Sequence, residues 1–231
     1  MEMQGNTTDS VEKLQSAVNS KERTMLDITN EDGVVIQQIE YMNGVPDGRG
    51  ITYDVNTRQK VQDMQFKEGK LHGEMIVYDQ VGNITAKLNY DNGVLSGPCE
   101  FYMDGKLILS GQYANGQYDG KLTYYDTFQN VVKEENYENG LKNGKSVSYA
   151  PNHQILKSET YLNGKLNGVS VSFYPGLDNA MHEYADYQDG KINGIAKIFY
   201  DDGNLQEIRV YSMGNIVGEI KRYDRNGNLI S

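Results

Sequence analysis

Hydrophobic and polar residues along this chain alternate over short runs that are bounded by turn sequences. Glu74–Tyr78 and Lys106–Ser110 are two such runs, rich in β-branched, aliphatic and aromatic residues and too short to form helices. Between runs of this kind lie Asn-Gly and Asp-Gly pairs, which favour tight hairpin turns because both residues tolerate a positive φ. The pattern therefore predicts short β-strands joined by tight turns along most of the chain.

The strands and turns recur as a repeat. An aromatic residue is followed by a glycine three positions later, by a second glycine four positions after that, and by another aromatic residue five positions further on. In one copy these residues are Tyr161, Gly164, Gly168 and Phe173. Such self-similarity indicates a repeat architecture in which each copy packs on its neighbours. The leading aromatic residues of the eight copies are Tyr41, Phe66, Tyr90, Tyr113, Tyr137, Tyr161, Tyr187 and Tyr211.

Each copy contains two turns and therefore two strands. The first turn lies at the first glycine, as in Asn163-Gly164, and the second follows the second aromatic residue, as in Asp79–Gly82. We expect the second glycine to let a ring from a neighbouring strand lie on bare backbone. Residues 24–40 resemble an additional half copy, with a turn at Asp32-Gly33.

These units predict an all-β protein. A single hairpin is marginal in water, so the hairpins must stack in order to bury their aromatic residues. The predicted fold is an elongated single antiparallel β-meander of eight hairpin repeats of about 24 residues, with a short N-terminal helix or tail. The predicted domains are residues 1–23, an acidic tail or a short helix opened by the capping box Asp9–Glu12, and residues 24–231, the repeat domain.

Composition and charge narrow the possible partners. The chain has 231 residues and a formal charge of −10, and the repeat positions hold sixteen of its 25 glycines and thirteen of its 18 tyrosines. The acidic balance disfavours nucleic acid and anionic membranes as partners, because both attract clustered lysines and arginines. Cys99 cannot form an internal disulfide, Met1–Ser10 lacks an apolar signal core, and no stretch nears the ~20 apolar residues of a membrane span. We expect a cytoplasmic protein.

The sequence shows no motif that points to catalysis, a metal or a cofactor. Gly140–Ser146 resembles a phosphate-binding loop, but it has three residues between its glycines where that loop has four, and no helix pattern follows. His72, His153 and His182 occupy three different repeat positions, and Cys99 stands where other copies have packing residues. We therefore expect no enzyme, no catalytic residue, no metal and no cofactor.

Four aromatic residues stand outside the repeat pattern. Phe101 and Tyr124 come one residue before the second motif aromatic, and Tyr174 and Tyr200 come one residue after it. We expect them to point to the sheet face opposite the motif aromatics and to form a second aromatic stripe with acidic neighbours. They are our predicted partner-binding residues, for a basic and partly apolar protein. The alternative is that they cover the second face without any partner.

The segment Tyr161–Gly168 resembles the MORN repeat (membrane occupation and recognition nexus). It is more similar to the bacterial variant found in the YwqK family of toxin–antitoxin and immunity proteins, and the resemblance covers about residues 24–231. The Gly-x-Gly that follows the turn in eukaryotic MORN repeats survives only at Gly48–Gly50, so the lipid-binding role of some of those proteins is not implied. The resemblance implies a non-enzymatic binding protein that neutralises a toxin.

The leading hypothesis is therefore an antitoxin or immunity protein that binds a cognate protein partner along its sheet and blocks that partner's active site. A basic toxin is the partner class we expect, because an acidic chain would be steered onto it. One alternative is a structural scaffold or a self-assembling protein, with a homodimer formed through an open sheet edge after the last copy. A membrane-surface binder is the third hypothesis.

Overall fold

The computed structural model describes residues 22–178 and 180–231. No described residue is helical, and the 22 strands form antiparallel hairpins in chain order, so the predicted all-β meander is confirmed. The predicted N-terminal tail or short helix, residues 1–23, lies outside the described residues except for its last two positions. The chain has two compact units, Met1–Leu107 with Tyr113–Gly116, and Ile108–Gln112 with Gln117–Ser231, and each is described by itself.

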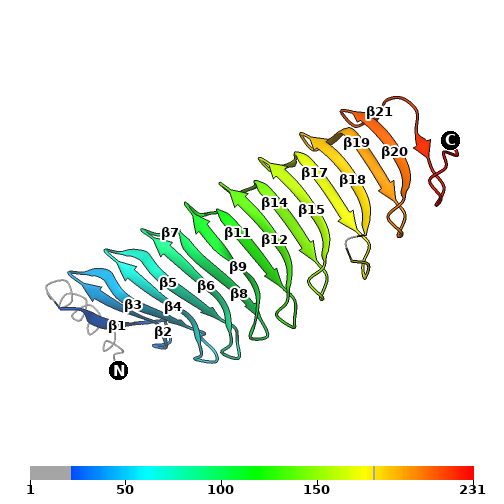
Figure 1. Cartoon of the computed structure of the whole chain (residues 1–231). Helices are drawn as coiled ribbons and strands as arrows, with labels where there is room; N and C mark the ends of the chain where they lie inside the picture. Colours follow the sequence, from blue (N-terminus) through cyan, green and yellow to red (C-terminus); the bar gives the residue numbers. More distant parts are fainter. Residues whose placement is uncertain (1–21, 179) are drawn as a thin grey trace, which may run out of the picture. The chain divides into compact units, whose positions relative to one another are not determined.

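Unit 1 is a meander in which each long strand pairs with the next (Figure 1). The predicted half copy is confirmed, because the turn at Asp32-Gly33 joins the first two strands. The strands are β1 (Thr24–Thr29), β2 (Val35–Met42), β3 (Val45–Tyr53), β4 (Lys60–Lys67), β5 (Lys70–Tyr78), β6 (Ile84–Asp91), β7 (Val94–Leu95) and β8 (Gly97–Met103), and β9 (Lys106–Ala114) is divided between the units.

Unit 2 continues the same pattern with shorter segments, because a break at the residue before the second motif glycine divides several strands in two. Its last described segment returns as a single bridge between Tyr223 and Leu229. The strands are β10 (Gln117–Tyr118), β11 (Gly120–Tyr125), β12 (Val131–Glu138), β13 (Leu141–Lys142), β14 (Gly144–Tyr149), β15 (Ile155–Leu162), β16 (Lys165–Leu166), β17 (Gly168–Phe173), β18 (Met181–Gln188), β19 (Lys191–Phe199), β20 (Leu205–Ser212), β21 (Asn215–Ile216) and β22 (Lys221–Arg222).

Backbone conformation explains the turn sequences. Both central residues of the first turn have positive φ, as in Asn163 at 50° and Gly164 at 80°, which is the geometry of a type I′ hairpin turn. The turn is kept even where the sequence signal is weak, since Glu68 and Met213 adopt φ values of 49° and 47°. The repeat's spacing and its glycines together hold this geometry.

The second motif glycine has a different role from the one expected. Gly144 lies opposite Tyr161 in the ladder, as predicted for a neighbouring ring, but it has a φ of 96°. A Cβ added there would lie 3.5 Å from the Cβ of Asn136, in the same hairpin, rather than against the ring. The glycine is therefore required by backbone geometry at a local bulge. A ring does cover bare backbone at Gly50, where an added Cβ would lie 2.6 Å from Phe66.

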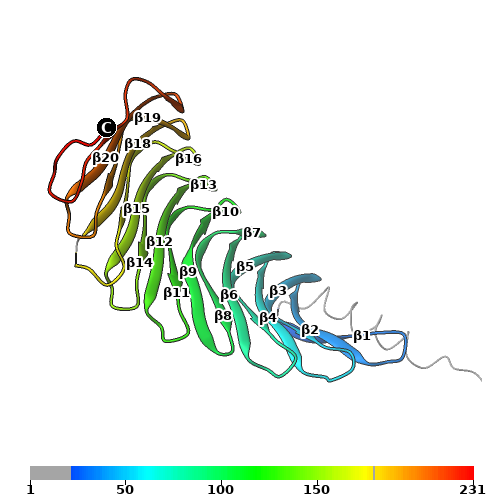
Figure 2. The ribbon, with the colours of Figure 1, turned by 90° about the vertical axis from the view of Figure 1, so that its right-hand side faces the viewer.

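Within each unit most of the buried residues lie in a line, which we call the central row of that unit. Each long strand contributes one residue to it, on the sheet face of the leading aromatic residues, which we call the row face. Within each unit the strands lie in a single layer, so the row takes the place of a core (Figure 2). In unit 1 the row consists of Leu26, Ile39, Gly50, Met64, Met75, Leu88 and Cys99, and in unit 2 of Gly111, Leu122, Glu135, Ser146, Glu159, Ser170, Ala185, Ala196 and Arg209.

Truncation of the central row should be costly. Leu122 is only 1% exposed, so the Leu122→Ala variant should lose about 3 kcal/mol of unfolding free energy through lost burial and the cavity left behind. Leu141→Ala is the control, because Leu141 is 51% exposed and its truncation should cost under about 1 kcal/mol. Urea denaturation followed by circular dichroism measures both variants. Equal losses would contradict a core located in the row.

Candidate partner-binding surface

The row face of unit 2 differs in chemistry from that of unit 1. Before Glu135 the row is formed by aliphatic, sulfur-containing and glycine residues, and from Glu135 onward it is formed by polar, charged and small ones. Polar groups in a buried row need partners, and small residues leave space. This half of the row therefore creates two features, a carboxylate cluster and a hollow.

The carboxylate cluster is centred on Glu135, which is 2% exposed. Its carboxylate accepts hydrogen bonds from the hydroxyls of Tyr124 and Tyr137, both at 3.0 Å. The ammonium groups of Lys133 and Lys142 each lie 2.6 Å from it. A buried charge with this many charge-assisted partners is stabilised in place, and it fixes the tyrosines and lysines around it.

The cluster shifts the ionisation of its members. Burial alone would raise the pKa of Glu135, but the ammonium groups of Lys133 and Lys142 and the hydroxyls of Tyr124 and Tyr137 lower it to about 2. Burial and the hydrogen bond to Glu135 raise the pKa of Tyr137 to about 12 and hold the pKa of Tyr124 above its ordinary value. At neutral pH the carboxylate is charged and both phenols are protonated donors.

The cluster continues into the next copy. Lys142 Nζ lies 5.2 Å from the centroid of the Tyr161 ring, a cation–π contact. The Tyr161 hydroxyl donates to Glu159 at 3.1 Å, and Lys157 Nζ lies 2.6 Å from that carboxylate. The row face between β12 and β17 thus presents oriented phenol rings and ammonium groups.

The hollow lies between β18, β19 and β20 and has a volume of about 150 Å³. It exists because the row residues there are Ala185 and Ala196, whereas unit 1 has Met64 and Met75 side by side in the row. Its lining also includes Ile192, Ile198, the aromatic residues Tyr184, Tyr187 and Tyr211, and the charged residues Glu183, Lys197, Glu207 and Arg209.

Ion pairs occupy one side of the hollow. Glu207 accepts from the Nε groups of Arg209 and Arg222, the latter at 2.8 Å. Burial would raise the pKa of Glu207, but these guanidinium groups lower it below its ordinary value. The side-chain carboxylate of Glu183, at the other side, forms no hydrogen bond or ion pair with any residue of the described chain.

The second turns differ between copies at the residue after the second aromatic. In copy two this residue is Asp79, whose carboxylate accepts from the backbone N–H groups of Val81 and Asn83 at 3.0 and 2.8 Å. These bonds close the turn on itself, which is the usual role of aspartate in a turn. The same position is held by Tyr174 in copy six and by Tyr200 in copy seven.

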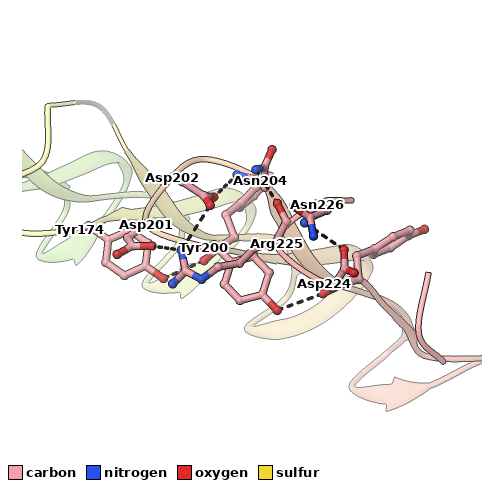
Figure 3. A network of polar contacts seen from close by, with 10 residues as sticks. Tyr174, Tyr200, Asp201, Asp202, Asn204, Asp224, Arg225 and Asn226 are labelled. Carbon is pink, nitrogen blue, oxygen red and sulfur yellow. Dashed lines mark hydrogen bonds and ion pairs between the residues drawn. The ribbon is translucent and has the colours of Figure 1, made fainter. Parts of the chain in front are cut away.

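The two tyrosines connect their turns to the next copy. The Tyr174 hydroxyl donates to the carbonyl of Phe199 at 2.7 Å, and the Tyr200 hydroxyl donates to the carbonyl of Tyr223 at 3.0 Å. Arg225 lies over the Tyr200 ring at 4.7 Å and pairs with Asp201 and Asp202 at 2.6 and 3.2 Å. Figure 3 shows this network at the turns.

Comparison with known families explains the repeat. The model of the MORN repeat variant matches residues 71–92 and residues 192–212, which span the hairpin strands β5–β6 and β19–β20. These two segments therefore match the MORN repeat variant. A stacked repeat architecture of this kind forms a binding or scaffold module. No curated protein matches the sequence.

Solved structures are similar only at a low level. A mutant of S. aureus TarM in complex with fondaparinux, alpha-GlcNAc-glycerol and UDP is 12% identical, with a TM-score of 0.27, over 70% of this chain and 24% of that chain. The GtfA/B complex bound to UDP and GlcNAc is 14% identical, with a TM-score of 0.23, over 71% of this chain and 34% of that chain. The matched regions are thus about a quarter to a third of those chains, and likeness at this level says nothing about function.

The predicted aromatic stripe is not formed as expected. The Tyr124 hydroxyl meets the same carboxylate as the leading aromatic Tyr137, so both lie on the row face. The second aromatic Tyr149 bonds instead to Glu134, on the opposite face. The two motif aromatics of a copy therefore lie on different faces, and no single face lies opposite them both.

The other three residues of the predicted stripe lie in different structural settings, and the four do not all share one face. Phe101 lies in β8 of unit 1, opposite Ala86, whereas Tyr124 lies in β11 of unit 2. Tyr174 and Tyr200 lie in turns beyond the ends of β17 and β19, not on a strand face, because the strands end at the second motif aromatic. A partner-binding role for these four residues stays a prediction.

Sequence reasoning missed the charged residues of the row. Two positions before the leading aromatic, copies one to three have Ile39, Met64 and Leu88, whereas copies five and eight have Glu135 and Arg209. A comparison of the copies column by column would have found this change. In the described part of the chain, no group of three or more His, Cys, Asp and Glu side chains could hold a metal ion. No helix among the described residues could span a membrane.

Removal of the Glu135 charge should destabilise the protein in a pH-dependent way. The Glu135→Gln variant should lose about 2 to 3 kcal/mol at pH 7, because it breaks charged hydrogen bonds in a buried site. The folded pKa of about 2 is below the unfolded value of about 4.3, so this contribution is present above the unfolded pKa and is lost as the pH falls towards 2. The difference in unfolding free energy between wild type and variant should therefore narrow as the pH falls through this range.

Chemical denaturation at a series of pH values measures this gap. Glu74→Gln is the control, because Glu74 is exposed in unit 1 and the variant removes the same charge. A gap for Glu135→Gln that stays constant down to pH 2 would contradict the assignment of the charge.

Loss of a turn hydroxyl should weaken the connection between copies. Tyr200→Phe removes the hydrogen bond to the Tyr223 carbonyl and should cost about 1 kcal/mol. Tyr90→Phe removes a hydroxyl for which the described chain provides no hydrogen bond and should cost little. Urea denaturation compares the two, and an equal effect would argue against a role for the Tyr200 hydroxyl.

Proposed function

We propose that this chain is a non-enzymatic protein-binding module that holds its partner against the row face of unit 2. The supporting observation is that this single-layered face carries oriented groups, the Glu135 cluster and the adjoining hollow, with no covering layer in the described chain. Tyrosine is a residue type enriched in protein interfaces, and here ordered tyrosine rings lie on a face that also has a depression for a partner side chain.

Within this class we place the protein among cytoplasmic antitoxins or immunity proteins. In this proposal it binds a cognate toxin and covers the toxin's active site. The formal charge of −10 supports a basic partner, since the field of an acidic chain raises the rate of encounter with it. The row face itself has nearly balanced charges, so the overall charge acts on approach, whereas tyrosines and ion pairs form the contact.

A second candidate is a structural scaffold that self-associates through a sheet edge. β22 has two residues, and its neighbouring segment exposes Leu229 and Ile230 by 60% and 63%. An edge with exposed apolar side chains is a template for pairing with another copy. Size-exclusion chromatography with light scattering tests this candidate. A concentration-dependent dimer that Leu229→Asp abolishes would favour the scaffold.

The binding proposal is tested by affinity capture with the full chain from its native host. One protein should be recovered in a stoichiometric complex, and its association rate should fall as the salt concentration rises. Lys157→Glu, on the row face, should weaken the complex by at least about fivefold, which corresponds to about 1 kcal/mol.

Lys121→Glu is the matched control, because Lys121 is similarly exposed and ion-paired but lies on the opposite face. Its complex should be unchanged. If Lys157→Glu and Lys121→Glu lowered the affinity equally, or if neither changed it, binding through the row face would be contradicted.

A further inference from the structure

The hollow between β18, β19 and β20 has the size of one side chain. Its volume is about 150 Å³, whereas small-molecule pockets usually measure ~300 to 1,000 Å³. At ~30 Å³ for each water, it holds the volume of only a few water molecules. A metabolite or cofactor would protrude from it, so the occupant that fits is a single extended side chain.

The lining of the hollow is apolar in the middle and aromatic at one end. Ala185, Ala196 and Ile198 come from adjacent strands and form its apolar part. Tyr187 and Tyr211 add rings, whose faces attract cations and pack against methylene groups. This combination suits an alkyl stem that ends in a positive charge.

Charges of both signs line the hollow, and its cations are already engaged, because Arg209 pairs with Glu207 and the Lys197 ammonium group lies 5.8 Å from the centroid of the Tyr184 ring. Glu207 is already paired with Arg209 and Arg222, so its charge is compensated within the chain. Glu183 is the lining carboxylate with no ion-pair partner among the described residues. Its carboxylate is therefore available to a donor that enters the hollow.

We propose that this hollow binds one long cationic side chain, lysine or arginine, of the protein partner. The stem lies over Ala185 and Ala196 beside the two tyrosine rings, and the cationic group is bound by Glu183. This inference rests on the proposed function, because it names the part of the partner that the row face recognises.

The repeat itself supplies the variant that closes the hollow. Ala196 comes two residues after the second motif glycine, and the equivalent residues in copies two and four are Met75 and Leu122. The fold therefore accepts a large aliphatic side chain at this position. Ala196→Leu should fill the hollow without loss of thermal stability, which separates loss of binding from loss of folding.

The test uses N-acetyl-lysine methylamide and N-acetyl-arginine methylamide as probes, titrated into the isotope-labelled full chain and followed by NMR. Signals of Ala185, Ala196 and Ile198 should shift in a saturable manner. N-acetyl-norleucine methylamide, which keeps the stem but has no charge, should bind at least about fivefold more weakly, as expected for one partly exposed ion pair.

Glu183→Gln should lower the affinity for the lysine probe by about fivefold, and Ala196→Leu should abolish binding of this probe. Glu74→Gln, which removes an equal charge from unit 1, should leave it unchanged. The inference would be overturned if the lysine probe still bound to both Glu183→Gln and Ala196→Leu. It would also be overturned if the norleucine probe bound as tightly as the lysine probe.

The same variants distinguish this inference from the proposed function. If partner capture depends on Lys157 but is unaffected by Glu183→Gln and Ala196→Leu, the hollow is not the recognition site and the binding proposal stands. If the hollow binds the lysine probe but the full chain captures no partner, the proposed function fails and the cation site stands.

Discussion

Each unit of this protein is a single layer of strands, and every other feature depends on how that layer finds burial. With no second layer among the described residues, one residue from each long strand must supply the packing that a core supplies elsewhere. Leu26, Met64, Cys99 and Leu122 do so as apolar groups. The central row is thus both the support of the sheet and the centre of one of its faces. A substitution in the row therefore changes both the stability of the sheet and the chemistry of the row face.

The carboxylate cluster and the hollow follow from two different substitutions in that row. A charged residue such as Glu135 is tolerated because neighbouring strands provide donors for it, and those donors become fixed in consequence. Alanines leave the volume that larger residues fill in unit 1. A surface with defined chemistry therefore arises without any insertion into the repeat. The same positions that hold the fold together also diversify it.

The strands and turns were predictable from sequence because they depend on local rules. Asn163-Gly164 requires a turn, and the fixed spacing of Tyr137 and Tyr161 sets the pairing. The face assignment failed because the leading and second aromatics of a copy, such as Tyr137 and Tyr149, are separated by a turn and by the bulge at Gly144, and a residue count does not follow the faces through these. Glu135 was missed because a carboxylate in an acidic chain is ordinarily a surface residue. The hollow could not be predicted because it depends on how side chains from three neighbouring strands, β18, β19 and β20, fill the space between them.

The aspartate and tyrosine turns have different consequences for how the chain comes apart. Asp79 bonds within its own turn, so its hairpin can detach without disturbing the turn of the next one. Tyr174 and Tyr200 bond to backbone carbonyls about one repeat further on, so opening one of these hairpins breaks a contact of the next. In a one-dimensional array such contacts raise the coupling between neighbours. Copies six to eight should consequently unravel as a block under load, whereas copies one and two, whose turns are closed by Asp54 and Asp79, should peel away singly.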